Sequence, residues 1–195
     1  MHTRAIIITF LLLLTAACWS SGRSGILGPV DETAEAIELV NQANDELQKI
    51  KVLYTENETK RAEIKKALET NNAEEVKKIS DHVVYAINDG FDFGKAAVDK
   101  IGEAQDLKIH PDFRDYLQLK EDALRKQMAA FEEYRQAARA LRDNYDPNNS
   151  EQREKVKTDF KNRSEKYAEL MEKARDQSSA ANELYKESLR KEAGL

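Results

Sequence analysis

Residues 110–150 read HPDFRDYLQLKEDALRKQMAAFEEYRQAARALRDNYDPNNS, and this stretch decides the fold class. Its apolar side chains recur every three or four residues, the period of one helix face; they are Phe113, Tyr116 or Leu117, Leu124, Met128, Phe131, Tyr134, Ala138 and Leu141. Pro111 can occupy the first helical position without losing a hydrogen bond. The run from Tyr145 to Asn149 stops the pattern, and Ser150 is placed to cap the next helix. The stretch therefore predicts one long helix with two sharp boundaries.

Three further segments of the chain, two before this helix and one after it, have stripes of apolar residues with the same period. The first predicts a helix over about residues 32–69, with interruptions at Asn57 and Arg61. Thr70-Asn71-Asn72 ends it, and Asn72 with Glu75 forms a capping pair for the second helix. That helix is expected to end before Leu107, and the last one continues from Ser150 almost to the C-terminus. Four long helices are therefore expected.

Short connections between long helices make consecutive helices antiparallel, because each helix must return along the one before it. We expect residues 31–195 to be an all-α domain, an elongated up-down-up-down four-helix bundle of antiparallel, coiled-coil-like helices. A second arrangement is a pair of helical hairpins that close their core only by oligomerising. Polar residues that fall on the stripes are expected to form polar layers in the core, which set its register; they are Asn44, Asn57, Arg61 and Ser178.

Composition excludes several classes of protein. Of the 195 residues, 34% are charged, which argues against a membrane-embedded protein. With 7 Gly and 3 Pro, the turn residues are too few for an all-β sandwich or barrel. The net charge is −5, with the two signs interleaved, so no concentrated basic face is expected for binding nucleic acid. The single cysteine, Cys18, excludes an intramolecular disulfide and a zinc site built from several thiolates.

The N-terminus has the design of a secretory signal peptide. A positive region ends at Arg4, an apolar run extends from Ala5 to Leu14, and the small residues Thr15-Ala16-Ala17 follow. The run is shorter than the ~20 residues that a bilayer-spanning helix needs. We therefore expect residues 1–17 to be removed from the mature protein.

Leu14-Thr15-Ala16-Ala17-Cys18 resembles the lipobox of bacterial lipoproteins, although Thr15 stands where that motif usually has Leu. The resemblance covers only the N-terminal region and implies that the thiol of Cys18 carries diacylglycerol, and that a peptidase cuts just before it. Two or three acyl chains hold a protein stably on a membrane. The alternative is ordinary signal-peptidase cleavage near Ala17, which leaves a secreted protein with a free thiol.

Residues 18–30 are expected to link this anchor to the helices. The stretch from Trp19 to Val30 contains three glycines and three serines and has no helical period, as is typical of a flexible tether. Twelve such residues span about 20 Å. By resemblance to the sorting of enterobacterial lipoproteins, Trp19 after Cys18 favours the outer membrane in a host with two membranes.

Asn88-Asp89-Gly90-Phe91-Asp92-Phe93-Gly94 is the most unusual stretch of the helical region. Gly90 and Gly94 are four residues apart, so in a continuous helix they share one face and permit close approach of a neighbouring helix. Alternatively, Asn-Asp-Gly breaks the helix. In a third interpretation Asp89 and Asp92 bind a cation or ligand at a kink, although the stretch lacks the spacing of a calcium-binding loop.

No catalytic constellation is expected. His82 and His110 are the only histidines after the predicted signal peptide, and no Glu-x-x-His pair, Cys-x-x-Cys-His motif or Gly-rich phosphate loop occurs. We therefore expect a protein that is not an enzyme, with no catalytic residue, no metal and no cofactor.

These observations predict a lipid-anchored protein of the cell envelope that has a non-catalytic binding, adaptor or structural role. The expected partners are membrane lipid, through Cys18, and an envelope protein. Two alternatives stay open: a periplasmic chaperone or holdase, and a sensor or carrier of a small ligand in a pocket near Gly90 and Gly94. The sequence leaves the ligand and the oligomeric state undetermined.

Overall fold

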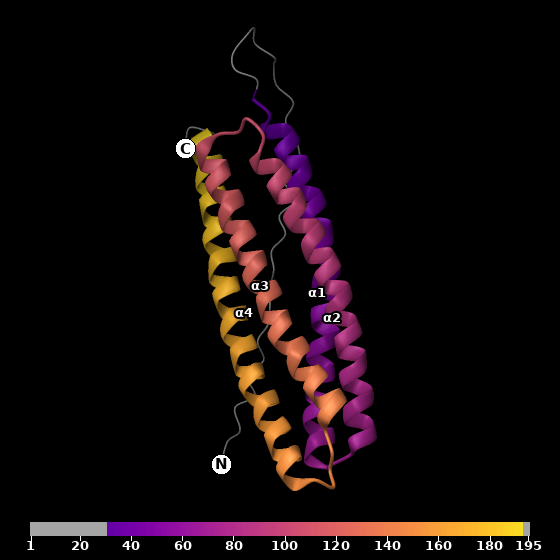
Figure 1. Cartoon of the computed structure of the whole chain (residues 1–195). Helices are drawn as coiled ribbons and strands as arrows, with labels where there is room; N and C mark the ends of the chain where they lie inside the picture. The colour runs from indigo at the N-terminus through magenta and orange to yellow at the C-terminus, as the bar shows by residue number, and fades with distance from the viewer. Residues whose placement is uncertain (1–30, 193–195) are drawn as a thin grey trace.

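The computed structural model describes residues 31–192, which form four α-helices (Figure 1). They are α1 (Thr33–Glu69), α2 (Ala73–Gln105), α3 (Pro111–Asn144) and α4 (Ser150–Glu192). The predicted all-α class is confirmed, and the boundaries lie close to the predicted start and stop signals. The predicted signal peptide and tether, residues 1–17 and 18–30, lie outside the described residues.

The turn between α1 and α2 has the predicted cap. Asn72 Oδ1 accepts a hydrogen bond from the amide of Glu75 at 3.2 Å, which satisfies a free donor in the first turn of α2. Asn71 adopts a positive φ of 52°, a conformation that Asn tolerates better than most residues. These two residues turn the chain from α1 back along α2.

The caps of α3 and α4 contain two features that the sequence pattern did not predict. His110 Nδ1 accepts a hydrogen bond from the Asp112 amide at 3.3 Å, so this histidine caps α3. At α4 the predicted cap is wrong by one residue: Asn149 Oδ1 accepts from the Gln152 amide at 3.1 Å, and Ser150 is already helical. Both Asn and Ser are good caps, so their order alone did not decide between them.

The helices form an elongated, antiparallel bundle (Figure 1). One end, called here the turn end, holds the turns at residues 70–72 and 145–149. The other end, called the connection end, holds the start of α1 and the link at residues 106–110 between α2 and α3. The tether predicted for residues 18–30 would enter the domain at the connection end, because it precedes α1.

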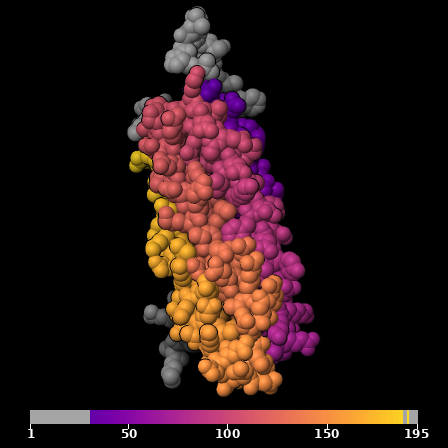
Figure 2. Space-filling view, in the orientation of Figure 1, coloured from indigo at the N-terminus to yellow at the C-terminus, as the bar shows by residue number. Residues whose placement is uncertain are grey.

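Helix packing is unequal around the bundle. α3 packs along α4, α1 along α2 and α2 along α3, whereas α1 and α4 share no extended backbone contact. Figure 2 shows the face of the bundle on which α3 lies between α2 and α4. The two hairpins therefore join within one chain, through α2 and α3, and oligomerisation is not needed to bring them together.

Aromatic side chains fill the core between α3 and α4. The Tyr134 ring centroid lies 5.4 Å from that of Tyr167 and 6.3 Å from that of Phe160. Near the connection end, Tyr116 lies 5.0 Å from Tyr185 in the same manner. Tilted aromatic pairs at these distances stabilise packing beyond the area that they bury.

The predicted polar layers are only partly correct. Asn57 is 5% exposed and Arg61 is largely buried, as expected, and Asn44 is partly buried. Ser178 is exposed, so its predicted place in the core is wrong, and Ser80 of α2 is fully buried instead. Small side chains such as serine fit either environment, which is why the stripe did not distinguish them.

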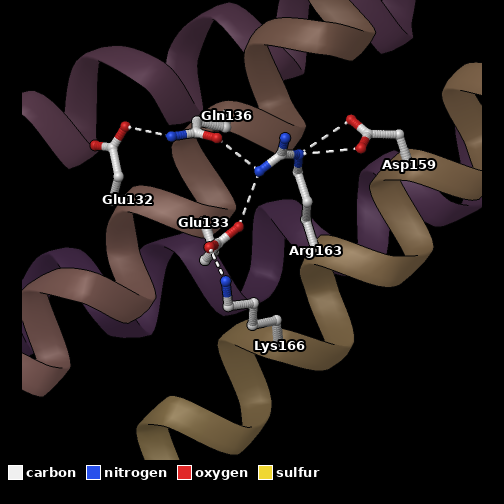
Figure 3. A network of polar contacts seen from close by, with 6 residues as sticks. All are labelled: Glu132, Glu133, Gln136, Asp159, Arg163 and Lys166. Atoms are coloured by element: carbon white, nitrogen blue, oxygen red, sulfur yellow. Dashed lines mark hydrogen bonds and ion pairs between the residues drawn. The ribbon is translucent and has the colours of Figure 1, made fainter.

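A polar network ties the outer surfaces of α3 and α4 together (Figure 3). Arg163 donates to Glu133 Oε2 at 2.9 Å, to Gln136 Oε1 at 2.6 Å and to Asp159 at 3.1 Å. Lys166 forms an ion pair with Glu133 at 2.7 Å, and this contact, followed by that of Arg163, lowers the pKa of the Glu133 carboxyl. The network fixes the rotation of α4 against α3.

One lysine of α3 lies partly buried, with no carboxylate partner in the described part of the chain. Burial lowers the pKa of Lys120 to about 8, and its Nζ lies 5.8 Å from the centroid of the Tyr116 ring. Burial also raises the pKa of the Tyr116 hydroxyl, to about 12. Both shifts have the same cause, since a low-dielectric environment disfavours the charged form of each group.

Replacing Lys120 by Met is expected to raise the free energy of unfolding at pH 7 by about 1 kcal/mol, because the variant does not bury a charged ammonium group in the folded state. Between pH 8 and ~10.4 the unfolded wild-type chain binds more protons at this position than the folded chain, so the wild type gains stability with rising pH. The advantage of Lys120→Met should therefore fade towards pH 10.

Urea denaturation at a series of pH values measures this difference. Lys95→Met, at an exposed lysine of α2, serves as the control and should show neither the gain nor its pH dependence. A change in the free energy of unfolding by Lys120→Met that stays constant from pH 7 to pH 10 would contradict the lowered pKa of Lys120 in the folded protein.

Candidate functional site

The widely spaced seam between α1 and α4 is bridged by long side chains. Lys157 Nζ of α4 donates to Asn71 Oδ1 at 3.3 Å, just beyond the end of α1. Further along, the hydroxyl of Tyr167 donates to Glu58 Oε1 of α1 at 3.2 Å. Between these bridges the two helices enclose a groove.

Arg61 of α1 forms the inner end of this groove. Its guanidinium lies 4.9 Å from the centroid of the Tyr167 ring and 5.5 Å from that of Tyr134, and it donates to Glu58 Oε1 at 2.9 Å. Burial raises the pKa of both tyrosine hydroxyls, so they stay neutral and their rings face the cation. One arginine thus connects α1 to both helices of the second hairpin.

The groove lies near the turn end and has a volume of about 580 Å³. This volume is within the usual range for small-molecule sites. Its apolar wall consists of Leu68 from α1 with Phe160 and Ala168 from α4. The polar wall is formed by charged side chains and one serine from the same two helices: Arg61, Lys65, Glu69, Lys157, Lys161, Ser164 and Glu165.

The cations of the groove differ in how far they are already neutralised. Arg61 is paired with Glu58, and Lys161 lies 3.9 Å from Glu165. Lys65 has no ion-pair partner among the described residues, and the partner of Lys157 is a neutral amide. The groove therefore presents one uncompensated ammonium group on α1 and one on α4.

Several buried polar atoms along this seam lack hydrogen-bond partners within the described part of the chain. They include Ser164 Oγ in the groove wall and the Nε of Arg61. Deeper in the core, Asn57 Oδ1 is also unpartnered. Unpaired buried polar atoms are uncommon in native proteins and mark places where a water or a ligand group can supply the missing bond.

The stretch around Gly90 and Gly94 does not form a ligand site of comparable size. α2 continues unbroken through it, so the interpretation of a helix break is wrong. Both glycines are buried, whereas Asp89 and Asp92 are exposed, which places the carboxylates away from the packed face. The cavity beside Gly90 has a volume of about 10 Å³, so it has room for about one water.

Gly94 has a packing role that the spacing of the glycines predicted. A Cβ atom at Gly94 would lie 3.0 Å from Sδ and 3.1 Å from Cγ of Met128 on α3. At Gly90 the nearest atom would be Leu53 Cδ1 at 3.7 Å, an ordinary contact distance. Close approach of a neighbouring helix therefore depends on Gly94 and hardly on Gly90.

The remaining candidate residues are dispersed. His82 Nε2 lies 2.9 Å from Glu56 Oε1 at an exposed position, and His110 serves as a cap. Within residues 31–192, no three His, Cys, Asp or Glu side chains gather as they would around a metal ion. Cys18, the predicted site of lipid attachment, lies outside the described residues.

Among residues 31–192, no helix combines the length and apolarity needed to cross a bilayer.

Sequence reasoning did not identify the groove, although it singled out one of its residues. The interruption of the first stripe at Arg61 was the available signal, and it was interpreted as a core layer. Lys65 and Lys157 have the pattern of ordinary surface lysines, and only the separation of α1 from α4 distinguishes them.

Comparisons with protein-family models, with curated proteins and with solved structures found no significant match to this chain.

Alanine substitution should distinguish the effects of the two glycines, Gly90 and Gly94, on stability. Gly90→Ala is expected to raise the free energy of unfolding by about 0.5–1 kcal/mol, because alanine favours the helix and meets no close atom. Gly94→Ala gains the same helix propensity but must displace Met128, so it should be less stable than Gly90→Ala by about 1 kcal/mol.

Chemical denaturation of both variants tests this difference. In a Met128→Ala background the two substitutions should have similar effects, since the obstructing side chain is gone. Equal effects in the otherwise unchanged chain would rule out the packing role of Gly94.

Proposed function

We propose that this chain is a lipoprotein of the cell envelope, anchored by diacylglycerol on Cys18, and that its helical bundle has a non-catalytic binding role. The observation that carries the anchoring is the lone cysteine placed directly after an apolar targeting segment, in the sequence Leu14-Thr15-Ala16-Ala17-Cys18. In a host with two membranes, Trp19 in the next position favours the outer membrane.

The arrangement of the bundle supports a role in presenting a binding site away from the membrane. The tether leads to Thr33 at the connection end, whereas the groove is lined by residues from Arg61 to Glu69 of α1. The helix from Thr33 to Arg61 is about 40 Å long. Anchored at residue 18, the domain would hold the groove at its far end, where envelope partners or ligands can reach it.

Among the alternatives, carriage of a small ligand has a specific observation in its favour, which is the groove itself. A holdase is supported less well, because it needs a large exposed apolar surface to grip unfolded chains. In the described part of the chain, the exposed large apolar side chains are Ile37, Val52 and Tyr85. The groove therefore makes ligand binding the second candidate function.

Replacing Cys18 by Ala is expected to move the protein from the membrane fraction to the soluble fraction of a bacterial host, because the thiol that accepts diacylglycerol is gone. Fractionation followed by immunoblotting measures the distribution. Ser20→Ala, two residues away in the tether, is the matched control and should stay in the membrane fraction.

The intact mass of the wild-type protein extracted from membranes provides a second readout. We expect a chain that begins at Cys18 and carries added diacylglycerol. An unmodified mass, or tight membrane association of Cys18→Ala, would overturn the anchoring.

A further inference from the structure

The dimensions of the groove restrict what can lie inside it. The part of α4 that lines it, from Lys157 to Ala168, is about 16 Å long. The space in the groove is about 580 Å³, within the usual range for small-molecule sites. The groove therefore has the length and the volume to hold a slender, unbranched small molecule.

The charges of the groove favour an anionic end group on that chain. Among the described residues, Lys65 on α1 and Lys157 on α4 are the two groove cations without a carboxylate partner, and they come from the two different helices that line the groove. A single carboxylate between them would face a cation on each side. The two acidic side chains of the rim, Glu69 and Glu165, are exposed, and Glu165 is partly compensated by Lys161.

The apolar wall of the groove lies close to these cations. Leu68 and Phe160 of this wall are 8% and 4% exposed, so they form the floor at the bottom of the groove. Ser164, whose Oγ has no hydrogen-bond partner, and Ala168 continue the same face of α4 toward Arg61. A long apolar segment can thus contact the floor while its charged end stays at the lysines.

We propose that this groove binds a long-chain carboxylate, that is, one unbranched acyl chain with a single anionic head group. The carboxylate lies between Lys65 and Lys157, and the chain lies along Leu68, Phe160 and Ala168. This inference rests on the binding role proposed for the bundle, and it is independent of the anchoring through Cys18.

Calorimetric titration with laurate tests the proposal. The expected mature chain, residues 18–195, is used with Cys18→Ser, which keeps attached lipid, the apolar run from Ala5 to Leu14 and detergent out of the sample. Acetate has the same charge without the chain, and dodecyltrimethylammonium has the same chain with the opposite charge. We expect laurate to bind one molecule per protein, at least tenfold more tightly than either of the other two.

Charge reversal locates the site. Lys65→Glu with Lys157→Glu is expected to weaken laurate binding at least tenfold. The matched control is Lys78→Glu with Lys155→Glu, which makes the same change in net charge at exposed lysines outside the groove and should leave binding unchanged. Ala168→Trp, which fills the groove from an exposed position, should also weaken binding. Circular dichroism verifies that each variant stays helical.

The proposal is overturned by an absence of laurate binding, by equal binding of dodecyltrimethylammonium, or by an equal loss of binding in the control pair of charge reversals. Binding of acetate as tight as that of laurate would also overturn it, because the apolar floor would then contribute nothing. None of these outcomes affects the fractionation of Cys18→Ala. Failure of the ligand assignment and failure of the anchoring are therefore distinguishable.

Discussion

The contact of the Arg61 guanidinium with the rings of Tyr134 and Tyr167 is the interaction on which the rest of the α1–α4 seam depends. Apolar helices pack at 8–10 Å between axes. Between α1 and α4, a guanidinium and its partner Glu58 occupy the space between the helices. In addition to the apolar contacts that α1 makes in the shared core, a cation therefore attaches it to the second hairpin. The space that this leaves between α1 and α4 is the groove.

The two sides of α4 have different roles as a result. On one side, Arg163 and Lys166 bind Glu133 of α3 and fix the helix in place (Figure 3). On the other side, Lys157 and Phe160 form a wall of the groove. Because the first set of contacts holds α4 rigidly, the second set is positioned before any ligand arrives, and a preformed site loses less free energy to ordering on binding.

The first helix after the proposed anchor begins at one end of the elongated domain, and the proposed binding site lies towards the other end. A ligand or partner at the turn end would be separated from the start of α1 by most of the length of that helix, from Thr33 to Arg61. Such an arrangement suits a protein that displays a site to its surroundings, and it separates the chemistry of attachment from the chemistry of binding. The two properties can therefore be examined by independent substitutions, at Cys18 and at the groove lysines.

The sequence by itself determined the four helices and most of their ends, because the apolar period, the capping residue Asn72 and the helix-starting Pro111 act within a few residues of the chain. It also identified Gly90 and Gly94 together as packing positions but left a helix break and a ligand site open as alternatives. Only the tertiary structure decided between them, since Met128 comes from another helix. The place of Ser80 instead of Ser178 in the core and the groove beside Lys65 were likewise settled only there. Burial and the separation between helices depend on side chains that are far apart in the sequence, so no local pattern specifies them.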